Sequence, residues 1–140
     1  MKISSKGRYG LKAMVDIAVF GKDKQVSLKS IAERHNISEA YLEQLAAALR
    51  RGGLIVSTRG AAGGYALSRP AEQITAGEIL RALEGSLTPV ECNGGCGDDC
   101  RTCVSKNVWR QLGEALDRAA DSIRLDQLAS DYRNMEDNEL

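Results

Sequence analysis

Long apolar runs and the residues of common catalytic sites are missing from this chain of 140 residues. No stretch approaches the roughly 20 apolar residues of a membrane-spanning helix. The opening segment MKISSKGRYGLK also lacks the apolar core of a signal peptide. We therefore expect a cytoplasmic protein with no membrane partner. The chain has a single histidine and shows no nucleophile–base pair, phosphate-binding loop or carboxylate pair, so an enzyme is not expected.

The formal net charge of zero hides a division into a basic half and an acidic half. Residues 1–70 contain 12 lysines and arginines against 5 acidic residues, whereas residues 71–140 contain 7 against 14. This division suggests a module that binds a polyanion, followed by a part that does not touch it, although charge on helices is often only a solvated face. The length allows one compact domain, or one small domain with a dimerisation element.

Apolar residues at helical spacing predict three short helices in the basic half. Their buried stripes are Leu11, Met14, Val15 and Ala18, then Leu28, Ile31, Ala32 and His35, then Leu42, Leu45, Ala46 and Leu49. Ser27 and Ser38 are the expected N-caps of the second and third helices, and Ile37 and Leu42 take the positions of a hydrophobic staple. Gly21, Asn36 and Gly52-Gly53 end the three helices. The last two helices could form a helix-turn-helix, but an ordinary helical hairpin fits these residues equally well.

The residues that follow favour the helix-turn-helix, because they predict a β-hairpin. Residues 54–58 form one expected strand and residues 65–68 the other, with the turn RGAAGG between them. A hairpin directly after a recognition helix is the wing of a winged helix. Arg59 lies at its tip beside glycines that let the backbone approach DNA, and an arginine there can enter a narrow minor groove.

Three segments, SKGRYGLKAM, SEAYLEQLAAALRRGGLI and TRGAAGGYALS, resemble the IscR, NsrR and CymR family of bacterial winged-helix transcription regulators. The similarity runs from residue 1 to about residue 128. It implies a mainly α fold with a small β wing, namely a winged helix-turn-helix followed by a cysteine loop and a long dimerisation helix. The wing departs from the usual family sequence, because Ala61 and Ala62 replace a Pro-Gly pair. This change bears on the stiffness and sequence preference of the wing.

Burial of the third helix's apolar stripe leaves a set of polar residues exposed for contact with DNA. We expect the major groove or its phosphates to be contacted by Ser38, Tyr41, Glu43, Gln44 and Arg50, and the minor groove by Arg59. By resemblance to IscR, Glu43 would determine specificity, since a carboxylate can accept a hydrogen bond from cytosine and repels nearby phosphates. The expected partner is a double-stranded DNA operator.

The acidic half predicts one short helix and one long one. Thr75 and Glu78 form a capping box that opens the first, which carries Ile79, Leu80 and Leu83 and ends at Gly85. The long helix carries an apolar seam in steps of four and three: Val108, Leu112, Ala115, Ala119 and Ile123. This seam could cover its own domain or pair with a second copy, and the family resemblance favours a homodimer. The expected organisation is a DNA-binding domain over 1–85, a cysteine loop over 86–104, a dimerisation helix over 105–128 and a frayed polar tail over 129–140.

Four cysteines lie within twelve residues, at Cys92, Cys96, Cys100 and Cys103. Disulfides rarely persist in the cytoplasm, so this spacing indicates metal binding or redox sensing. Dense cysteine runs with turn-forming glycines can wrap an iron–sulfur cluster. Structural zinc is the main alternative, but zinc sites more often use two separated ligand pairs, and a metal-free thiol switch is a third possibility. All four cysteines are the expected metal ligands.

The family resemblance implies an iron–sulfur cluster, of the 2Fe–2S type in IscR-like members and the 4Fe–4S type in NsrR-like members, and we expect 2Fe–2S first. Family members of this kind usually supply three cysteines, and IscR adds a histidine where this chain has Lys106. The single histidine, His35, is expected to be a packed or partly exposed neighbour of the core. The extra cysteine would then replace the missing histidine, and either Cys96 or Cys100 could hold the middle position.

These observations lead to one main functional hypothesis and two alternatives. The main hypothesis is a dimeric, sequence-specific transcription regulator, a repressor or an activator, whose DNA affinity follows the occupancy or oxidation state of its cluster. A regulator of the same fold could instead be controlled by a protein partner or by thiol oxidation, as CymR-like members are. A small iron–sulfur redox protein is the alternative from another class.

Overall fold

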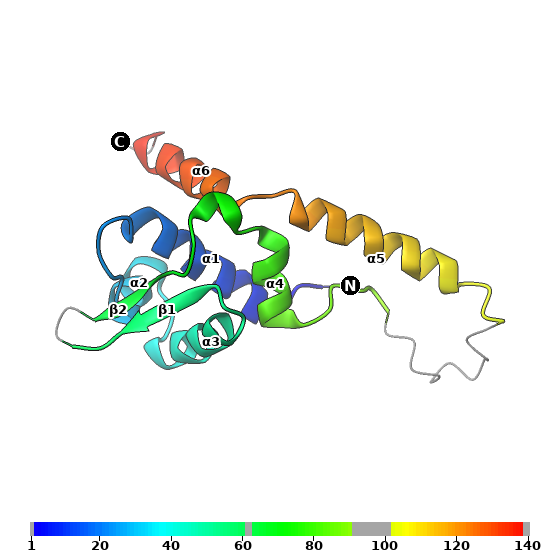
Figure 1. The fold of residues 1–140 in the computed structure, drawn as a ribbon, viewed down its shortest axis with the longest axis horizontal. Coiled ribbons are helices and arrows are strands. Elements are labelled where there is room, and N and C mark those ends of the chain that lie inside the picture. Colours follow the sequence, from blue (N-terminus) through cyan, green and yellow to red (C-terminus); the bar gives the residue numbers. More distant parts are fainter. Residues whose placement is uncertain (1, 61–62, 91–101, 139–140) are drawn as a thin grey trace.

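The computed structural model describes residues 2–60, 63–90 and 102–138. The fold is mainly helical with one small sheet, as predicted (Figure 1). In chain order its elements are α1 (Ser5–Phe20), α2 (Leu28–His35), α3 (Glu39–Arg51), β1 (Ile55–Thr58), β2 (Gly64–Leu67), the 3₁₀ helix η1 (Ala71–Gln73), α4 (Ala76–Glu84), α5 (Lys106–Asp121) and α6 (Leu125–Asn138). No helix within these ranges is both long and apolar enough to cross a membrane.

The helices of the basic half begin and end at the residues that the sequence marks for this role. The Ser27 side chain accepts a hydrogen bond from the Ser30 backbone N–H, and the Ser38 side chain accepts one from Tyr41. Asn36 ends α2 in the left-handed conformation with φ of 53°, and Gly21 ends α1. The turn between α2 and α3 is therefore fixed by local hydrogen bonds, as a helix-turn-helix requires.

One apolar core joins the helix-turn-helix to the wing and to α4. Its fully buried side chains include Met14, Ile31, Leu42, Leu45, Leu49, Leu54, Ile55, Ile74, Ile79 and Leu125. Strands β1 and β2 pair antiparallel, with Ile55 opposite Leu67 and Thr58 opposite Gly64. The inner end of the hairpin is thus anchored by buried Ile55, while the next three residues of β1 are exposed. This arrangement projects the outer end of the wing away from the core (Figure 1).

The C-terminal part differs from the expected long helix and frayed tail. Helix α5 ends at Asp121, and the chain then runs beside residues 74–76. The Ala76 backbone N–H donates to the Ile123 carbonyl, and the Leu125 backbone N–H donates to the Ile74 carbonyl, each at 2.8 Å. A second helix, α6, follows and packs along α1. Leu125 and Ala129 of α6 are buried, and the Tyr132 ring packs edge-on against Phe20 of α1, so a helix of largely polar composition is docked on the core.

Candidate DNA interface and cysteine segment

Helix α3 buries one face and presents the opposite one to solvent. Leu42, Leu45, Ala46 and Leu49 are buried, as the sequence predicts. Of the six residues expected at the DNA, five are exposed and Tyr41 is half-buried: Ser38, Tyr41, Glu43, Gln44, Arg50 and Arg59. The first five lie at the N-cap or within α3, and Arg59 directly follows β1. The structure therefore places the five on one continuous element and the sixth on the neighbouring hairpin.

Arg50 and Tyr41 connect α3 to its neighbours on opposite sides. The Arg50 guanidinium donates to the Ser57 hydroxyl on β1 at 3.3 Å. The Tyr41 hydroxyl lies 3.1 Å from the Ser5 hydroxyl at the start of α1, and its ring packs edge-on against Tyr9. One side of α3 therefore adjoins the wing, and the other adjoins the first turn of α1.

Glycines in the wing permit backbone approaches that a side chain would block. A Cβ on Gly63 would lie 2.4 Å from the Thr58 carbonyl oxygen across the hairpin. A Cβ on Gly64 would lie 2.5 Å from the Val26 carbonyl, where Val26 and Tyr65 exchange backbone hydrogen bonds of 2.9 and 2.8 Å. These contacts hold the first residues of β2 against Val26, just before the N-cap of α2. The expected effect of Ala61 and Ala62 on the wing concerns residues outside the described ranges.

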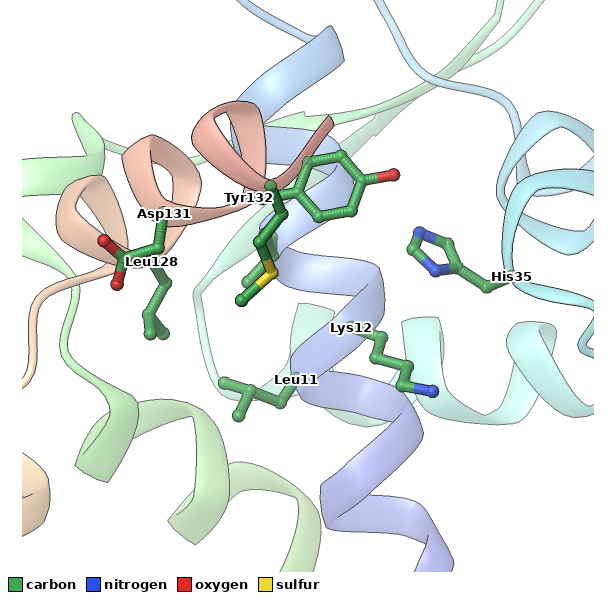
Figure 2. Close-up of a pocket in the computed structure, with 8 residues that line it drawn as sticks. Leu11, Lys12, His35, Leu128, Asp131 and Tyr132 are labelled. Atoms are coloured by element: carbon green, nitrogen blue, oxygen red, sulfur yellow. The ribbon is translucent and has the colours of Figure 1, made fainter. Parts of the chain in front are cut away.

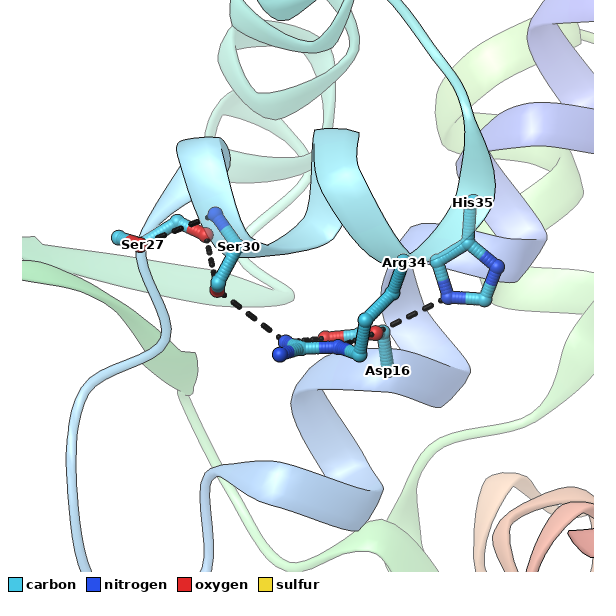
Figure 3. A network of polar contacts seen from close by, with 5 residues as sticks. All are labelled: Asp16, Ser27, Ser30, Arg34 and His35. Carbon is cyan, nitrogen blue, oxygen red and sulfur yellow. Dashed lines mark hydrogen bonds and ion pairs between the residues drawn. The ribbon is translucent and has the colours of Figure 1, made fainter.

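A buried carboxylate holds α2 against α1 (Figure 3). Asp16 of α1 has no exposed surface, and its two oxygens accept from Arg34 Nη2 at 2.6 Å and Nε at 2.7 Å. His35 Nε2 lies 2.9 Å from the same carboxylate, and the Arg34 guanidinium stacks over Phe20 at 4.1 Å. This hydrogen bond and ion pair raise the pKa of Arg34. His35 is thus a packed neighbour of the core, as predicted.

A pocket of about 320 Å³ lies on the other side of His35 (Figure 2). Leu11 and Lys12 of α1 and Leu128, Asp131 and Tyr132 of α6 line it. The Tyr132 ring lies 6.1 Å from the His35 ring, so α6 reaches the end of α2 as well as α1. Helix α6 therefore supports the turn of the helix-turn-helix, which the expected frayed tail would not do.

Glu84, the last residue of α4, caps the first turn of α1. Its carboxylate accepts from the backbone N–H groups of Ser4 at 2.9 Å and Gly7 at 3.0 Å, and from the Ser4 hydroxyl. The Ser4 hydroxyl is the main cause of a lowered pKa at Glu84, and the two N–H groups and the charge of Lys6 act in the same direction. Gly7 allows this contact, because a Cβ there would lie 2.6 Å from the carboxylate oxygen.

Helix α5 contacts α4 on one face and leaves its apolar seam open to solvent. Arg81 of α4 forms ion pairs with Asp117, at 3.2 Å, and with Asp121. On the seam, Val108 and Leu112 are each 49% exposed. Ala115, Ala119 and Ile123 are also exposed, although Ile123 lies just beyond the end of α5. The seam therefore does not pack on its own domain, which was the alternative to pairing with a second copy.

Three of the four expected metal ligands, Cys92, Cys96 and Cys100, lie outside the described residues. Cys103 is described and half-buried, and its Sγ lies 3.3 Å from the Ser105 hydroxyl. The Lys106 backbone N–H donates to the Cys103 carbonyl at 3.4 Å, so Cys103 lies one turn before the start of α5. Among the described residues, no three histidine, cysteine or acidic side chains converge on a common metal position.

Two contacts were not predicted from the sequence: the ion pair of Asp16 with Arg34 and the cap that Glu84 forms on α1. Asp16 does carry a signal, since a carboxylate between the apolar residues of a buried helix requires a cationic partner. Glu84 carries no comparable signal, because its partners, two backbone N–H groups and the Ser4 hydroxyl, lie about eighty residues earlier in the chain.

Comparison with known proteins agrees with this architecture. The model of the Rrf2 family, described as "Iron-dependent Transcriptional regulator", matches residues 3–131. The chain is 45% identical over 130 residues to the HTH-type transcriptional regulator CymR of Bacillus subtilis (strain 168), covering 93% of this chain and 91% of that protein. It is 38% identical over 138 residues to the HTH-type transcriptional regulator IscR of Yersinia enterocolitica, covering 97% and 84%.

A solved structure of CymR (YrzC), described as the global cysteine regulator of B. subtilis, superposes with a TM-score of 0.78. The two share 44% sequence identity, over 93% of this chain and 97% of that one. The match includes α5 and α6 as well as the winged helix, since it covers nearly the whole length of both. The chain therefore belongs to the Rrf2 family and is a DNA-binding transcription regulator.

Proposed function

We propose that the protein is a homodimeric, sequence-specific regulator whose affinity for its operator depends on the state of its cysteine segment. The observation that carries this proposal is the solvent-exposed polar face of α3 beside Arg59. Helix α3 would enter the major groove, and Arg59 would enter the adjacent minor groove. Such a regulator works in the bacterial cytoplasm, where its operator is.

The side chains on α3 suit different parts of the DNA. Glu43 can accept a hydrogen bond from the amino group of cytosine, and Gln44 can pair with the edge of adenine. Ser38, Tyr41 and Arg50 carry hydroxyl or guanidinium donors that suit phosphates, which set the position of the protein without reading sequence. Glu43 is therefore the residue that we assign to specificity.

The exposed seam on α5 supports the dimer. Val108 lies in the first turn of α5 and Leu112 about one turn later, and the side chains of both are 49% exposed. A second copy of this helix would bury these side chains, and because each is already about half-buried, each would contribute about 1 kcal/mol, roughly half of the value for full burial. Two recognition helices in fixed relation would then read two half-sites one helical turn apart.

The cysteine segment is the proposed control element. Four thiols are a donor set that suits iron–sulfur clusters, and Cys92, Cys96, Cys100 and Cys103 would hold one. The description of the Rrf2 family as iron-dependent and the likeness to IscR support this assignment. A 2Fe–2S cluster is proposed first and a 4Fe–4S cluster second. When bound, the cluster would supply a redox-active centre next to α5.

A second candidate has the same DNA-binding surface but no cluster. The likeness to CymR, whose solved structure is described as that of a cysteine regulator, favours control through thiol oxidation or a protein partner. The two candidates differ in what the four cysteines bind and agree on the operator contacts.

Anaerobic purification followed by visible absorption and Mössbauer spectroscopy separates the two candidates, because only the first requires iron and sulfide.

DNA binding is tested by selection from a random duplex library, followed by titration of the selected site. Arg59→Ala should weaken binding to every selected sequence, whereas Glu43→Ala should relax base preference more than it lowers affinity. Lys22→Gln serves as the control, because Lys22 is exposed and lies near η1. Unchanged selectivity in Glu43→Ala would remove this residue from base readout.

A further inference from the structure

The exposed face of α3 has two flanks, and the wing adjoins only one of them. Glu43 and Arg50 are seven residues apart, which is nearly two helical turns, so they share a flank. Arg50 contacts Ser57 of the wing, which identifies this flank as the wing side. Gln44 and Arg51 are also seven residues apart and lie about 100° further round the helix, on the side away from the wing.

The flank away from the wing meets the start of α1 in a cavity of about 370 Å³. Lys6 lines it from α1, and Tyr41, Gln44 and Arg51 line it from α3. Lys6 and Arg51 are both exposed, and no carboxylate is among the described residues that line this cavity. The hydroxyls of Ser5 and Tyr41 lie 3.1 Å apart at its edge. The cavity therefore combines two cations and the Tyr41 hydroxyl, with the Ser5 hydroxyl beside it, and this is a donor set that suits phosphate oxygens.

The dimensions of DNA explain why this flank would face phosphates. The major groove is about 12 Å wide, and a helix with its side chains is about 10–12 Å across, so a helix in the groove has one phosphate backbone on each side. The wing flank of α3 faces one backbone. The other flank, with the first turn of α1, then faces the second.

The first turn of α1 is held in place for this role. Glu84 accepts hydrogen bonds from the backbone N–H groups of Ser4 and Gly7, which lie on either side of Lys6. Because these bonds fix the backbone, binding at Lys6 requires the ordering of only one side chain.

We propose that Lys6 and Arg51 form a second phosphate-binding flank of the DNA interface, across α3 from the wing, with the hydroxyls of Ser5 and Tyr41 as further donors. This inference rests on the proposed DNA-binding function. It extends the interface to α1, an element outside the helix-turn-helix and the wing. The partner is the sugar–phosphate backbone of duplex DNA, so the flank contributes affinity without base preference.

The test is the salt dependence of operator affinity, measured with the full chain on its selected duplex. Each phosphate contact contributes about 0.9 to the slope of log affinity against log salt concentration. Each substitution occurs twice in the proposed homodimer, so Lys6→Gln and Arg51→Gln should each reduce the magnitude of the slope by about 2. Each should weaken binding roughly ten- to hundredfold near 0.1 M salt. Lys6→Arg keeps the charge and should keep the slope. Lys22→Gln, just beyond the C-terminal end of α1, should change neither quantity.

The outcomes separate this inference from the function on which it rests. Normal slopes and affinities in both glutamine variants, together with weakened binding in Arg59→Ala, would overturn the flank and leave the proposed function intact. A changed base preference in Lys6→Gln or Arg51→Gln would also overturn the phosphate assignment. Failure of the unaltered protein to select any duplex would instead refute the DNA-binding proposal itself, and the flank with it. Both positions are exposed, so thermal unfolding of the variants should match that of the unaltered protein.

Discussion

Arg34 and Asp16 form a two-point contact, in which the guanidinium donates through Nε and Nη2 to the two oxygens of a fully buried carboxylate. The pair joins the first helix of the helix-turn-helix to α1, and His35 adds a further contact at 2.9 Å. Because the Arg34 side chain is 31% exposed, solvent reaches one partner of the pair but not the other. The position of α2 relative to the core therefore depends on a charge that has no access to water.

Replacement of this carboxylate is the first prediction. Asp16→Asn keeps the shape of the side chain but removes its charge, so Arg34 loses a charged partner and one of its two strong hydrogen bonds. We expect the free energy of unfolding to fall by about 3 kcal/mol, as measured by urea denaturation at neutral pH. The control is Asp23→Asn, since Asp23 is an exposed loop residue between α1 and α2. A loss below about 0.5 kcal/mol would show that the network contributes little to stability.

The Glu84 cap predicts a specific pH dependence of stability. Its pKa is lowered in the folded state, so ionisation favours folding and the folded protein binds this proton less readily than the unfolded chain. The contribution is complete above the ordinary glutamate pKa of about 4.3 and disappears as the pH falls through that value and then through the lower pKa of the folded state. Glu84→Gln should therefore lower stability by about 1–2 kcal/mol at pH 7, and by much less at pH 3.

The same pH series with Glu72→Gln provides the control for this cap. Glu72 is exposed on η1 and shows no such set of backbone donors. The measurement is denaturant unfolding from pH 7 to pH 3 for the unaltered protein and both variants. If the Glu84→Gln difference stays constant over this range, the carboxylate does not act through its charge.

The local parts of this fold were predictable from the sequence, and the long-range parts were not. Ser27, Ser38 and Asn36 act on residues within one turn of themselves, so their roles follow from the pattern of neighbouring residues. The contact of Glu84 with Ser4 depends on how α4 packs against α1, which no local pattern encodes. Helix α6 was missed because only Leu125 and Ala129 are buried in a segment that otherwise reads as polar.

The same distinction applies to the candidate sites. The expected polar residues of α3 follow from the burial of its apolar stripe, so they could be predicted from helical periodicity, although Tyr41 is half-buried. The phosphate flank could not, because Lys6 and Arg51 come together only through the packing of α1 beside α3. The metal assignment still rests on cysteine spacing and family likeness, since only Cys103 lies among the described residues.

The α5 seam predicts that charge placed on it will weaken the dimer. Val108→Asp together with Leu112→Asp would place unpaired carboxylates in the proposed interface, at a cost of several kcal/mol. We expect the dissociation constant of the dimer to rise at least about 100-fold, as measured by analytical ultracentrifugation over a dilution series. Gln111→Asp is the matched control, because Gln111 is exposed on the same helix but does not belong to the seam. A double variant that still sediments as a dimer at the original affinity would locate the interface elsewhere.

The cysteine segment predicts unequal roles for its four thiols. Cys92 and Cys103 bracket the segment, and Cys103 lies one turn before α5, so the loss of either would remove an end of the site. If all four cysteines bind the cluster, each single Cys→Ala variant should give an incomplete and labile visible spectrum after anaerobic reconstitution. If the family's three-cysteine pattern holds, either Cys96→Ala or Cys100→Ala should instead keep a normal spectrum.

Lys106→His then offers a rescue, because a histidine at the first residue of α5 restores the ligand that IscR-like members carry at this position. It should recover cluster binding in the inner variant that lost it, while Lys106→Gln should not. A complete cluster spectrum in the Cys92→Ala, Cys103→Ala double variant would contradict the site, since neither end of the segment would then be a ligand.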